Sequence, residues 1–151
     1  MKKYRGKKMD NGKWIYGQLL AASDGSRYII PSDAKLFLPN GSTTLCTVEC
    51  YPVDPKTVAV EIGMYDKHRT PIYAGDIVKN HMGFEQVVVY EGCCYRFVAL
   101  LDYIYGERQG ETFFACAKKC IDYENNITCD EIIGNIIDNA DMVKKPDPDD
   151  E

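Results

Sequence analysis

Short runs of β-forming residues alternate with turn residues along most of the sequence, and this alternation is what most constrains the fold. The runs are rich in Val, Ile, Tyr and Phe, which favour pleated strands, and none has the period and length of an amphipathic helix. The predicted strands cover residues 14–20, 27–30, 36–38, 43–51, 57–62, 77–79, 85–91 and 131–137, with further β-forming residues over 94–105. This pattern predicts a mainly β chain with little helix, whose many short antiparallel strands form a partly open barrel or a sandwich.

Turn signals separate these runs. A turn at residues 10–12 contains the step Asn11-Gly12, and an Asn-Gly step is the strongest short hairpin signal. We expect Pro52 to end the strand that begins at residue 43, because proline donates no ladder hydrogen bond. Residues 112–120 suit a short helix as well as a strand, and Asn139 is expected to cap a last turn.

The length bounds the domain organisation. A chain of 151 residues buries roughly two thirds of its unfolded surface, enough for stability without a metal or a disulfide. We expect one β-rich domain over residues 1–143, or two lobes that meet near residues 52–62. The Pro and Asp content of residues 144–151 predicts a disordered acidic tail.

The net charge of −5 disfavours a protein that binds duplex nucleic acid, because such binding depends on clustered Lys and Arg that neutralise phosphates. The densest basic cluster lies at the N-terminus, where alternate members of an extended strand point to opposite faces. It consists of Lys2, Lys3, Arg5, Lys7 and Lys8. We favour a solvated strand flank over a small nucleic-acid footprint.

Two absences bear on location. Residues 1–5 are not followed by the apolar stretch of a secretory signal, and no run of eighteen apolar residues occurs. We therefore expect a cytoplasmic protein that makes no membrane contact.

The seven cysteines form no familiar framework. Their number is odd, no pair has the C-x-x-C spacing, and Cys46 and Cys50 would lie roughly 13 Å apart along a strand. Cys116 and Cys120 suit one helix face, but the chain offers few histidines to complete a site. We expect free thiols that behave as small buried hydrophobes, and no metal or cofactor site.

No catalytic grouping stands out. His68 and His81 both fall in predicted polar turns, and no Ser or Cys lies near either of them in sequence. The glycines do not have the spacing of a phosphate-binding loop. Trp14, Tyr16 and Tyr90 offer an aromatic binding surface, although core packing and cross-strand pairing explain such residues as well.

The most distinctive string runs from residue 72 to residue 79 and contains Tyr73, Gly75 and Asp76. Gly75 can adopt a positive φ, and Asp76 can bond the backbone of the turn before the chain enters a strand. Asp76 could also serve as an acid, a base or a metal ligand. We favour the turn role, because no second acidic residue lies near it in sequence.

Three stretches together resemble the YopX family of phage and prophage proteins. They cover residues 4–17, residues 53–78 and residues 133–143, and the last of them includes Gly134 and Asn135. The resemblance implies a β-rich domain from a bacterial host or its phage, and it brings no catalytic residue with it. One departure concerns the turn after Asp66-Lys67, where the family tends to have Asn-Gly and this chain has His68-Arg69.

Three hypotheses of function follow from these observations. The leading one is a non-enzymatic protein-interaction module that binds itself or a host or phage protein. The alternatives are a nucleic-acid-associated accessory protein and an enzyme whose site is assembled from residues distant in sequence. Because the sequence contains no catalytic motif, we favour a non-enzymatic protein over an enzyme.

Overall fold

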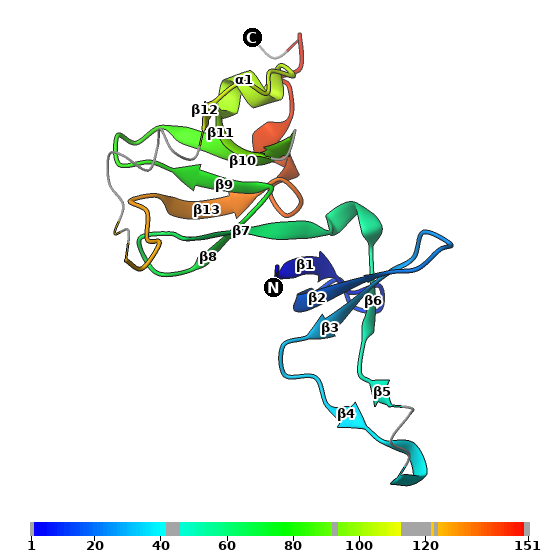
Figure 1. Cartoon of the computed structure of the whole chain (residues 1–151). Coiled ribbons are helices and arrows are strands. Elements are labelled where there is room, and N and C mark those ends of the chain that lie inside the picture. The colour runs from blue at the N-terminus through cyan, green and yellow to red at the C-terminus, as the bar shows by residue number, and fades with distance from the viewer. Residues whose placement is uncertain (1, 42–45, 92–93, 113–121, 123, 150–151) are drawn as a thin grey trace. The chain divides into compact units, whose positions relative to one another are not determined.

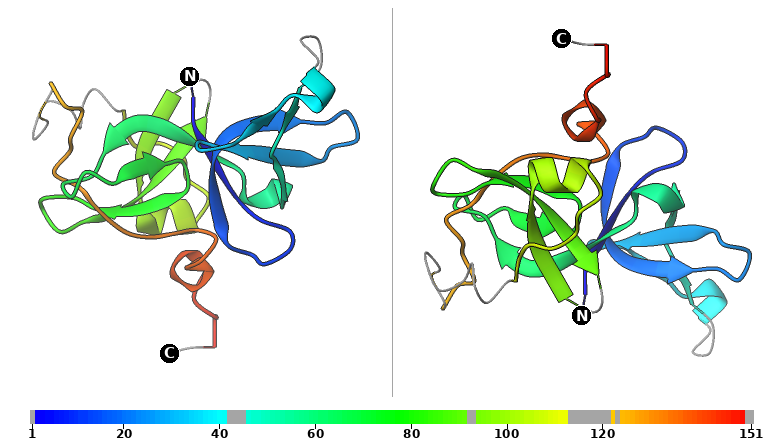
Figure 2. Two further views of the ribbon diagram at one scale, coloured as in Figure 1. Left: turned by 90° about the horizontal axis from the view of Figure 1, so that it is seen from below. Right: turned by 90° about the horizontal axis from the view of Figure 1, so that it is seen from above.

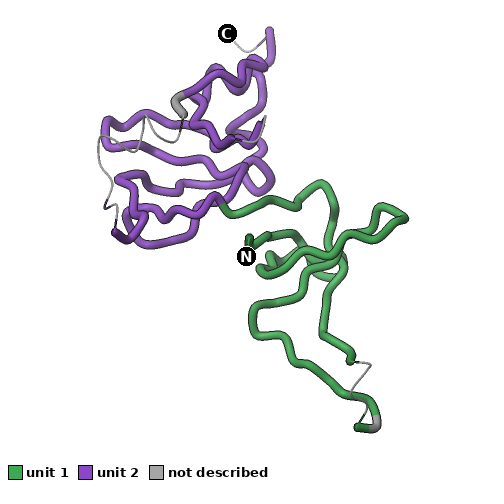
Figure 3. The backbone as a smooth tube through the Cα atoms, viewed as in Figure 1, with its two compact units in different colours: residues 1–61 green, residues 62–151 purple. Residues whose placement is uncertain are grey.

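Two compact units make up the chain in the computed structural model, which describes residues 2–41, 46–91, 94–112, 122 and 124–149 (Figure 1). Unit 1 is Met1–Glu61 and unit 2 is Ile62–Glu151 (Figure 3). The division falls inside one strand, β7 (Ala59–Tyr65), whose first residues belong to unit 1 and whose last residues belong to unit 2.

Unit 1 is an antiparallel sheet in the order β6-β3-β2-β1-β7. Its strands are β1 (Tyr4–Lys7), β2 (Trp14–Ala21), β3 (Arg27–Pro31), β6 (Tyr51–Val53) and the start of β7. Its core is formed by Ile15, Ile29 and Val53, which project from one face of the sheet. Side chains alternate between the two faces of a strand, so Trp14, Tyr16 and Leu20 project from the other face.

A two-stranded ribbon extends from this sheet. It consists of β4 (Leu36–Phe37) and β5 (Thr47–Val48), with the 3-10 turn η1 (Pro39–Gly41) between them. The predicted strand over 43–51 is therefore wrong in part: Glu49 and Cys50 separate β5 from β6, and residues 43–45 lie outside the described residues.

Pro52 does not end a strand as predicted, because it lies inside β6. A residue's N–H and C=O point to the same side of a strand, and the Pro52 carbonyl accepts a hydrogen bond from Met9 N at 3.0 Å. The Pro52 nitrogen therefore faces away from β3, and the β3–β6 ladder loses no hydrogen bond.

Unit 2 contains an antiparallel sheet in the order β12-β11-β10-β9-β13, seen from two further directions in Figure 2. Its strands are β9 (Asp76–Lys79), β10 (Glu85–Glu91), β11 (Cys94–Ala99), β12 (Glu111–Thr112) and β13 (Glu131–Asn135), and β8 (Pro71–Tyr73) follows β7. The core joins Met64 and Ile72 to Val78, Val88 and Phe97. The helix α1 (Leu100–Ile104) contacts β10, β11 and the 3-10 turn η3 (Ala140–Val143).

The prediction of a mainly β chain of short antiparallel strands with little helix is confirmed. Neither large sheet closes into a barrel within the part of the chain that the structure describes. The predicted β-forming run over 94–105 is a strand only as far as Ala99 and then becomes a helix. Ala99 pairs with Gln86, next to the first residue of β10, so the neighbouring strand does not extend further along the run. The ambiguous segment 112–120 lies almost wholly outside the described residues.

Three smaller predictions are wrong among the described residues. The closing strand stops at Asn135 rather than Ile137, because the Asn135 side chain turns the backbone. Asn139 occupies the N-cap position of η3 but makes no side-chain cap bond there. Of the described cysteines, Cys46, Cys50 and Cys129 are exposed rather than buried, so their thiols do not contribute to the core.

Candidate functional site

The turn between β8 and β9 holds Tyr73, Gly75 and Asp76. Asp76 is buried, and its Oδ2 accepts a hydrogen bond from Tyr73 N at 2.8 Å. Gly75 has φ +88°, its N–H donates to Val88 O at 2.7 Å, and its carbonyl accepts from Ile136 N at 2.9 Å. One turn is thereby bonded to β10 on one side and to the residue after β13 on the other.

Gly134 and Asn135 form a second polar turn at the end of β13. The Asn135 Oδ1 accepts from Ile137 N and Asp138 N, at 3.0 and 2.8 Å. The Asn139 Oδ1 in turn accepts from Asn135 N at 3.1 Å. A Cβ at Gly134 would lie 2.4 Å from that Asn139 oxygen, so the hydrogen bond from Asn135 N to Asn139 Oδ1 depends on a glycine at position 134.

The hairpin turns 66–70 and 80–84 share one hydrogen-bond pattern. In the first, Asp66 Oδ1 accepts from His68 N and Thr70 N, both at 2.9 Å. In the second, Asn80 Oδ1 accepts from the corresponding two amides at 3.0 Å. Each turn also has the same two backbone bonds, and its fourth residue has a positive φ. That fourth residue is Gly83 in one turn and Arg69, with φ +65°, in the other.

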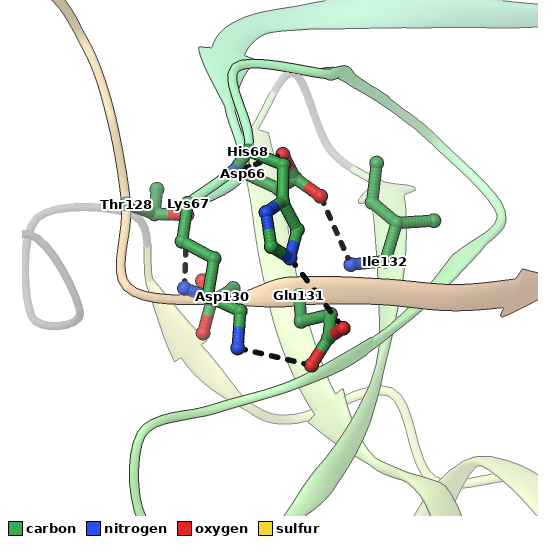
Figure 4. Close-up of polar contacts among 7 residues, drawn as sticks. All are labelled: Asp66, Lys67, His68, Thr128, Asp130, Glu131 and Ile132. Carbon is green, nitrogen blue, oxygen red and sulfur yellow. Dashed lines mark hydrogen bonds and ion pairs between the residues drawn. The ribbon is translucent and has the colours of Figure 1, made fainter.

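Asp66 differs from Asn80 because it is buried and because it reaches another strand. Its Oδ2 accepts from Ile132 N in β13 at 3.3 Å, and Lys67 N donates to Asp130 O at 2.8 Å (Figure 4). Three backbone amides thus converge on one carboxylate. Such a carboxylate holds the turn against β13. Most of its oxygen lone pairs already accept hydrogen bonds, so few remain for catalysis or for binding a ligand.

An exposed ion-pair group lies over this buried carboxylate. Lys67 Nζ lies 3.1 Å from one Glu131 oxygen and His68 Nε2 lies 3.5 Å from the other (Figure 4). The hydrogen bond and charge of Lys67, with a smaller contribution from His68, hold the pKa of Glu131 below its usual value. Since these side chains are largely solvated, the ion pair contributes little to the stability of the fold.

The predicted aromatic residues Trp14 and Tyr16 lie on the face of the unit 1 sheet that is opposite its core. Lys7 pairs with Trp14 and Arg5 with Tyr16 across β1 and β2, and directly opposite residues share a face. Across β2 and β3, Leu20 pairs with Tyr28 in the same way. We call this surface the β2 face. It consists of Arg5, Lys7, Trp14, Tyr16, Leu20 and Tyr28.

The β2 face has a cationic part and an apolar part. The Arg5 guanidinium lies 4.8 Å and the Lys7 ammonium 5.3 Å from the centroid of the Trp14 ring. Arg5 is buried, whereas Tyr16 and Leu20 are each 45% exposed. Aromatic rings hold cations at such distances, so Trp14 positions both positive charges at one end of β2.

Tyr90, the third predicted aromatic, lies in unit 2 on β10. Its side chain is exposed, and its ring centroid lies 4.8 Å from that of its cross-strand partner Tyr95. Among the described residues, no group of three or more His, Cys, Asp or Glu is placed to hold a metal ion. Nor does that part of the chain contain a helix long and apolar enough to span a membrane.

Two features of the structure were not predicted from the sequence. The first is Asp66, which an alignment of residues 66–70 with 80–84 would have revealed, since both begin with an Asx residue and precede a strand. The second is the division of charge between the units. Residues 1–61 carry nine Lys and Arg against six Asp and Glu, a net +3, and residues 62–151 carry nine against seventeen, a net −8.

Antiparallel sheets in two units, with turns fixed by the buried carboxylates of Asp66 and Asp76, define a β-rich class of protein rather than a recognisable catalytic class. The sequence profile of a family described as YopX protein matches residues 3–144. The chain belongs to the YopX family, as the three motif stretches predict.

A solved structure gives the same fold. The crystal structure of protein EF1440 from Enterococcus faecalis is similar with a TM-score of 0.60 and 17% sequence identity, over 95% of this chain and 99% of that chain. At this identity the likeness concerns the fold alone. A search of curated proteins finds no match.

Proposed function

We propose that this YopX-family protein is a non-enzymatic interaction module, encoded by a phage or prophage, that binds a protein partner in the cytoplasm of a bacterial host. The observation that carries the proposal is the β2 face. Tyr16 and Leu20 are exposed beside Trp14, on a sheet whose opposite face forms the core of unit 1. Trp, Tyr and Arg are the residues on which binding energy at protein interfaces concentrates.

The family motif has a supporting role in this proposal. Asp66, Asp76 and Asn135 each accept hydrogen bonds from backbone amides at a strand end. We assign Tyr73, Gly75, Asp76, Gly134 and Asn135 to the architecture of unit 2. Residues that shape turns in this way are needed by any function of the fold and do not themselves define one.

Affinity capture from a bacterial lysate with three purified proteins tests the proposal. The wild type is compared with the double variant Tyr16→Asp, Leu20→Asp and with the control Leu101→Asp, which places a charge at an exposed leucine of α1. Circular dichroism first establishes that all three are folded. We expect one protein partner to be retained by the wild type and the control and lost by the double variant.

Two results would overturn the proposal. One is a set of captured proteins that is the same for the wild type and the double variant, and the other is capture that nuclease treatment abolishes. Sedimentation velocity of the purified wild type, with the same variants as controls, tells whether the partner is a second copy of the chain.

The net charge of +3 on residues 1–61 favours a second candidate, a nucleic-acid-associated accessory protein. Binding through phosphates weakens steeply as salt rises. Fluorescence anisotropy with a labelled 20-nucleotide single strand at low and at physiological salt tests this candidate. Absent binding, or binding that does not change with salt, excludes it.

A further inference from the structure

We infer that the ribbon of β4 and β5 is a self-association site, at which β5 pairs antiparallel with β5 of a second copy of the chain. This inference goes beyond the proposed function and does not rest on it, because it involves no residue of the β2 face. It comes from the outer edge of β5 and from the order of residues 46–50 along that edge.

One face of the ribbon is apolar and exposed. Leu36 lies directly opposite Val48, so the two side chains share a face, and they are 62% and 38% exposed. The neighbouring Phe37 and Leu38 are exposed as well. Among the described residues, β4 and β5 pair only with each other (Figure 1). Two strands alone are marginally stable in water, so the ribbon gains stability from added strands.

The backbone groups of β5 alternate between β4 and the outer edge. Glu49 N donates to Lys35 O at 3.4 Å, so the N–H and C=O of Glu49 point toward β4. The direction alternates from residue to residue along extended chain, so those of Cys46, Val48 and Cys50 point outward. Pro52 faces the same way, and its carbonyl accepts from Met9 N.

The open part of this edge is therefore residues 46–50. Among the described residues, no backbone hydrogen bond is formed by Cys46, Val48 or Cys50. An edge with unpaired N–H and C=O groups accepts another strand unless Lys, Pro or a bulge protects it. Lys35 and Pro39 flank β4, whereas residues 46–50 contain neither residue type. Strand addition is thus favoured at β5 and opposed at β4.

The order of residues 46–50 suits pairing with a second copy of the same segment. A twofold axis through Val48 places Val48 opposite its own copy and Cys46 opposite Cys50 of the second copy. These residues all present backbone groups to the edge, so each opposed pair exchanges both hydrogen bonds. Glu49 then lies opposite Thr47 of the second copy, and no like charges face each other. The contact is small, so the dimer is weak and depends on concentration.

Sedimentation velocity of the whole chain, over a dilution series under reducing conditions, tests the association. The wild type is compared with Val48→Pro and with the control Val48→Ile. Proline removes the outward N–H at position 48 without removing a β4–β5 bond, whereas isoleucine keeps that N–H. Circular dichroism establishes that both variants are folded. We expect Val48→Pro to raise the dimer dissociation constant at least tenfold and Val48→Ile to leave it within threefold.

Cysteine variants test the register without a change to the backbone. Opposed residues of such a pair have Cα atoms about 5.5 Å apart, within reach of a disulfide, whereas Cys46 and Cys50 of one copy are roughly 13 Å apart. Glutathione disulfide should therefore link Cys46 of one copy to Cys50 of the other, and each link formed reduces one glutathione disulfide to two glutathione molecules.

The readout is mass spectrometry of the tryptic peptide 36–56, which contains both cysteines. We expect the wild type to give linked pairs of this peptide. Cys46→Ser alone and Cys50→Ser alone should give none, because each leaves a cysteine opposite a serine. A mixture of the two variants should give linked pairs again, since one copy supplies Cys46 and the other Cys50.

Four results would each overturn the inference. They are a chain that is monomeric at every concentration, association that Val48→Pro leaves unchanged, linked peptides in either single cysteine variant, and no linked peptides in the mixture. A monomeric chain would leave the edge of β5 to a strand of another polypeptide.

The double variant Tyr16→Asp, Leu20→Asp separates this inference from the proposed function. It should form the same dimer as the wild type, because neither residue lies on the ribbon. If the dimer is lost in this variant, the β2 face joins the copies, so the inference fails and the proposed function stands. If the dimer persists and no captured partner depends on Tyr16 and Leu20, only the proposed function fails.

Discussion

Gly75 has a φ of +88°, and its amide and carbonyl bond to Val88 and Ile136. A Cβ placed there would meet Ile136 at 3.4 Å, which is an ordinary contact, so any cost of a side chain arises from the backbone conformation. We predict that Gly75→Ala destabilises the protein by more than about 1 kcal/mol. The measurement is the free energy of unfolding from urea denaturation.

Gly75→Asn is the matched control, because asparagine tolerates positive φ better than alanine does. We expect it to lose less stability than Gly75→Ala. An alanine variant as stable as the wild type would contradict the assignment of Gly75 to the turn.

Arg69 also has a positive φ, +65°. It occupies the same position in the turn 66–70 as Gly83 does in the turn 80–84. An L-residue in the left-handed region costs about 1 kcal/mol, and glycine avoids most of this cost. We predict that Arg69→Gly raises the free energy of unfolding by up to about 1 kcal/mol. Arg69→Ala removes the charge but keeps the strain, so it should leave stability nearly unchanged. A stabilisation as large in the alanine variant would point to charge instead.

Sequence reasoning at this scale reaches the residues whose role is local. Gly75 and Asp76 act within a few positions of one another, so their residue types are enough to suggest a turn. The bond from Ile132 N to Asp66 joins residues that are 66 positions apart. Turn chemistry alone cannot predict such a contact, because it depends on which strand becomes the neighbour of the turn.

At the scale of elements, the turns 66–70 and 80–84 form a natural comparison, because Asp66 and Asn80 accept the same two local amides. Asp66 is buried and also accepts from β13, whereas Asn80 lies in a turn whose side-chain bonds are exposed. A buried amide that loses its acceptor costs about 1–3 kcal/mol. We predict that Asp66→Ala lowers the free energy of unfolding by more than about 2 kcal/mol.

Asn80→Ala serves as the control, since it removes the same local bonds without releasing another strand. Its expected cost is about 1 kcal/mol. Hydrogen exchange should show lost protection in β13 for the Asp66 variant only. If urea denaturation shows that the two variants lose the same free energy of unfolding, the hydrogen bond from Ile132 N in β13 to Asp66 contributes nothing to stability.

Glu131 links the 66–70 turn to β13 through Lys67 and His68, and its pKa is lowered mainly by Lys67. A carboxylate with a depressed pKa in the folded state stabilises the protein above its unfolded value, near 4.5, and this stabilisation is lost as pH falls through the folded pKa. We predict that the urea midpoint of the wild type exceeds that of Glu131→Gln at pH 6.

This difference between the wild type and Glu131→Gln should disappear in acid, once the pH is below the folded pKa. Lys67→Met should likewise have a lower urea midpoint than the wild type at pH 6 and lose this difference in acid, because it removes the main cause of the lowered pKa of Glu131. A difference that persists undiminished in acid would exclude the ion pair as its origin.

The elements that sequence reasoning predicts well are those whose pairing lies next to them in the chain. The hairpin of β1 and β2 follows from Asn11-Gly12, and β10 matches its predicted bounds. The errors at Pro52 and after Ala99 both depend on the neighbouring strand. β6 continues through Pro52 because the proline nitrogen faces away from β3, and β11 stops at Ala99 because its pairing has reached the first residues of β10. Residue propensities carry no information about where a neighbouring strand ends.

At the scale of the whole molecule, composition gives the net charge of −5 but not its division. The +3 and −8 emerge only once the boundary at residues 61 and 62 is known, and that boundary lies inside the strand β7, so no loop marks it in the sequence. The net charge of the chain therefore concealed the basic character of unit 1. Arg5 and Lys7 were seen in the sequence as part of a basic cluster but were interpreted as a solvated strand flank, so the candidate binding surface was predicted from its aromatic residues alone.

The C-terminal tail gives the last prediction at this scale. Residues 144–149 are exposed, whereas Met142 and Val143 are partly buried and η3 contacts α1. The ring contact of Lys145 is weak, with its Nζ at 5.9 Å from the Tyr105 ring centroid. We predict that removing residues 144–151 shifts the midpoint of thermal unfolding by less than about 2 °C, because almost no apolar surface is lost.

Removing residues 140–151 is the matched comparison, since it also takes away η3 and its contacts with α1. We expect this longer truncation to lower the midpoint by several degrees, because Met142 and Val143 lose buried area at roughly 25 cal/mol per Å². Calorimetry of both truncations against the whole chain measures the difference. If the shorter truncation is as damaging as the longer one, the tail makes stabilising contacts, and the folded domain does not end at residue 143.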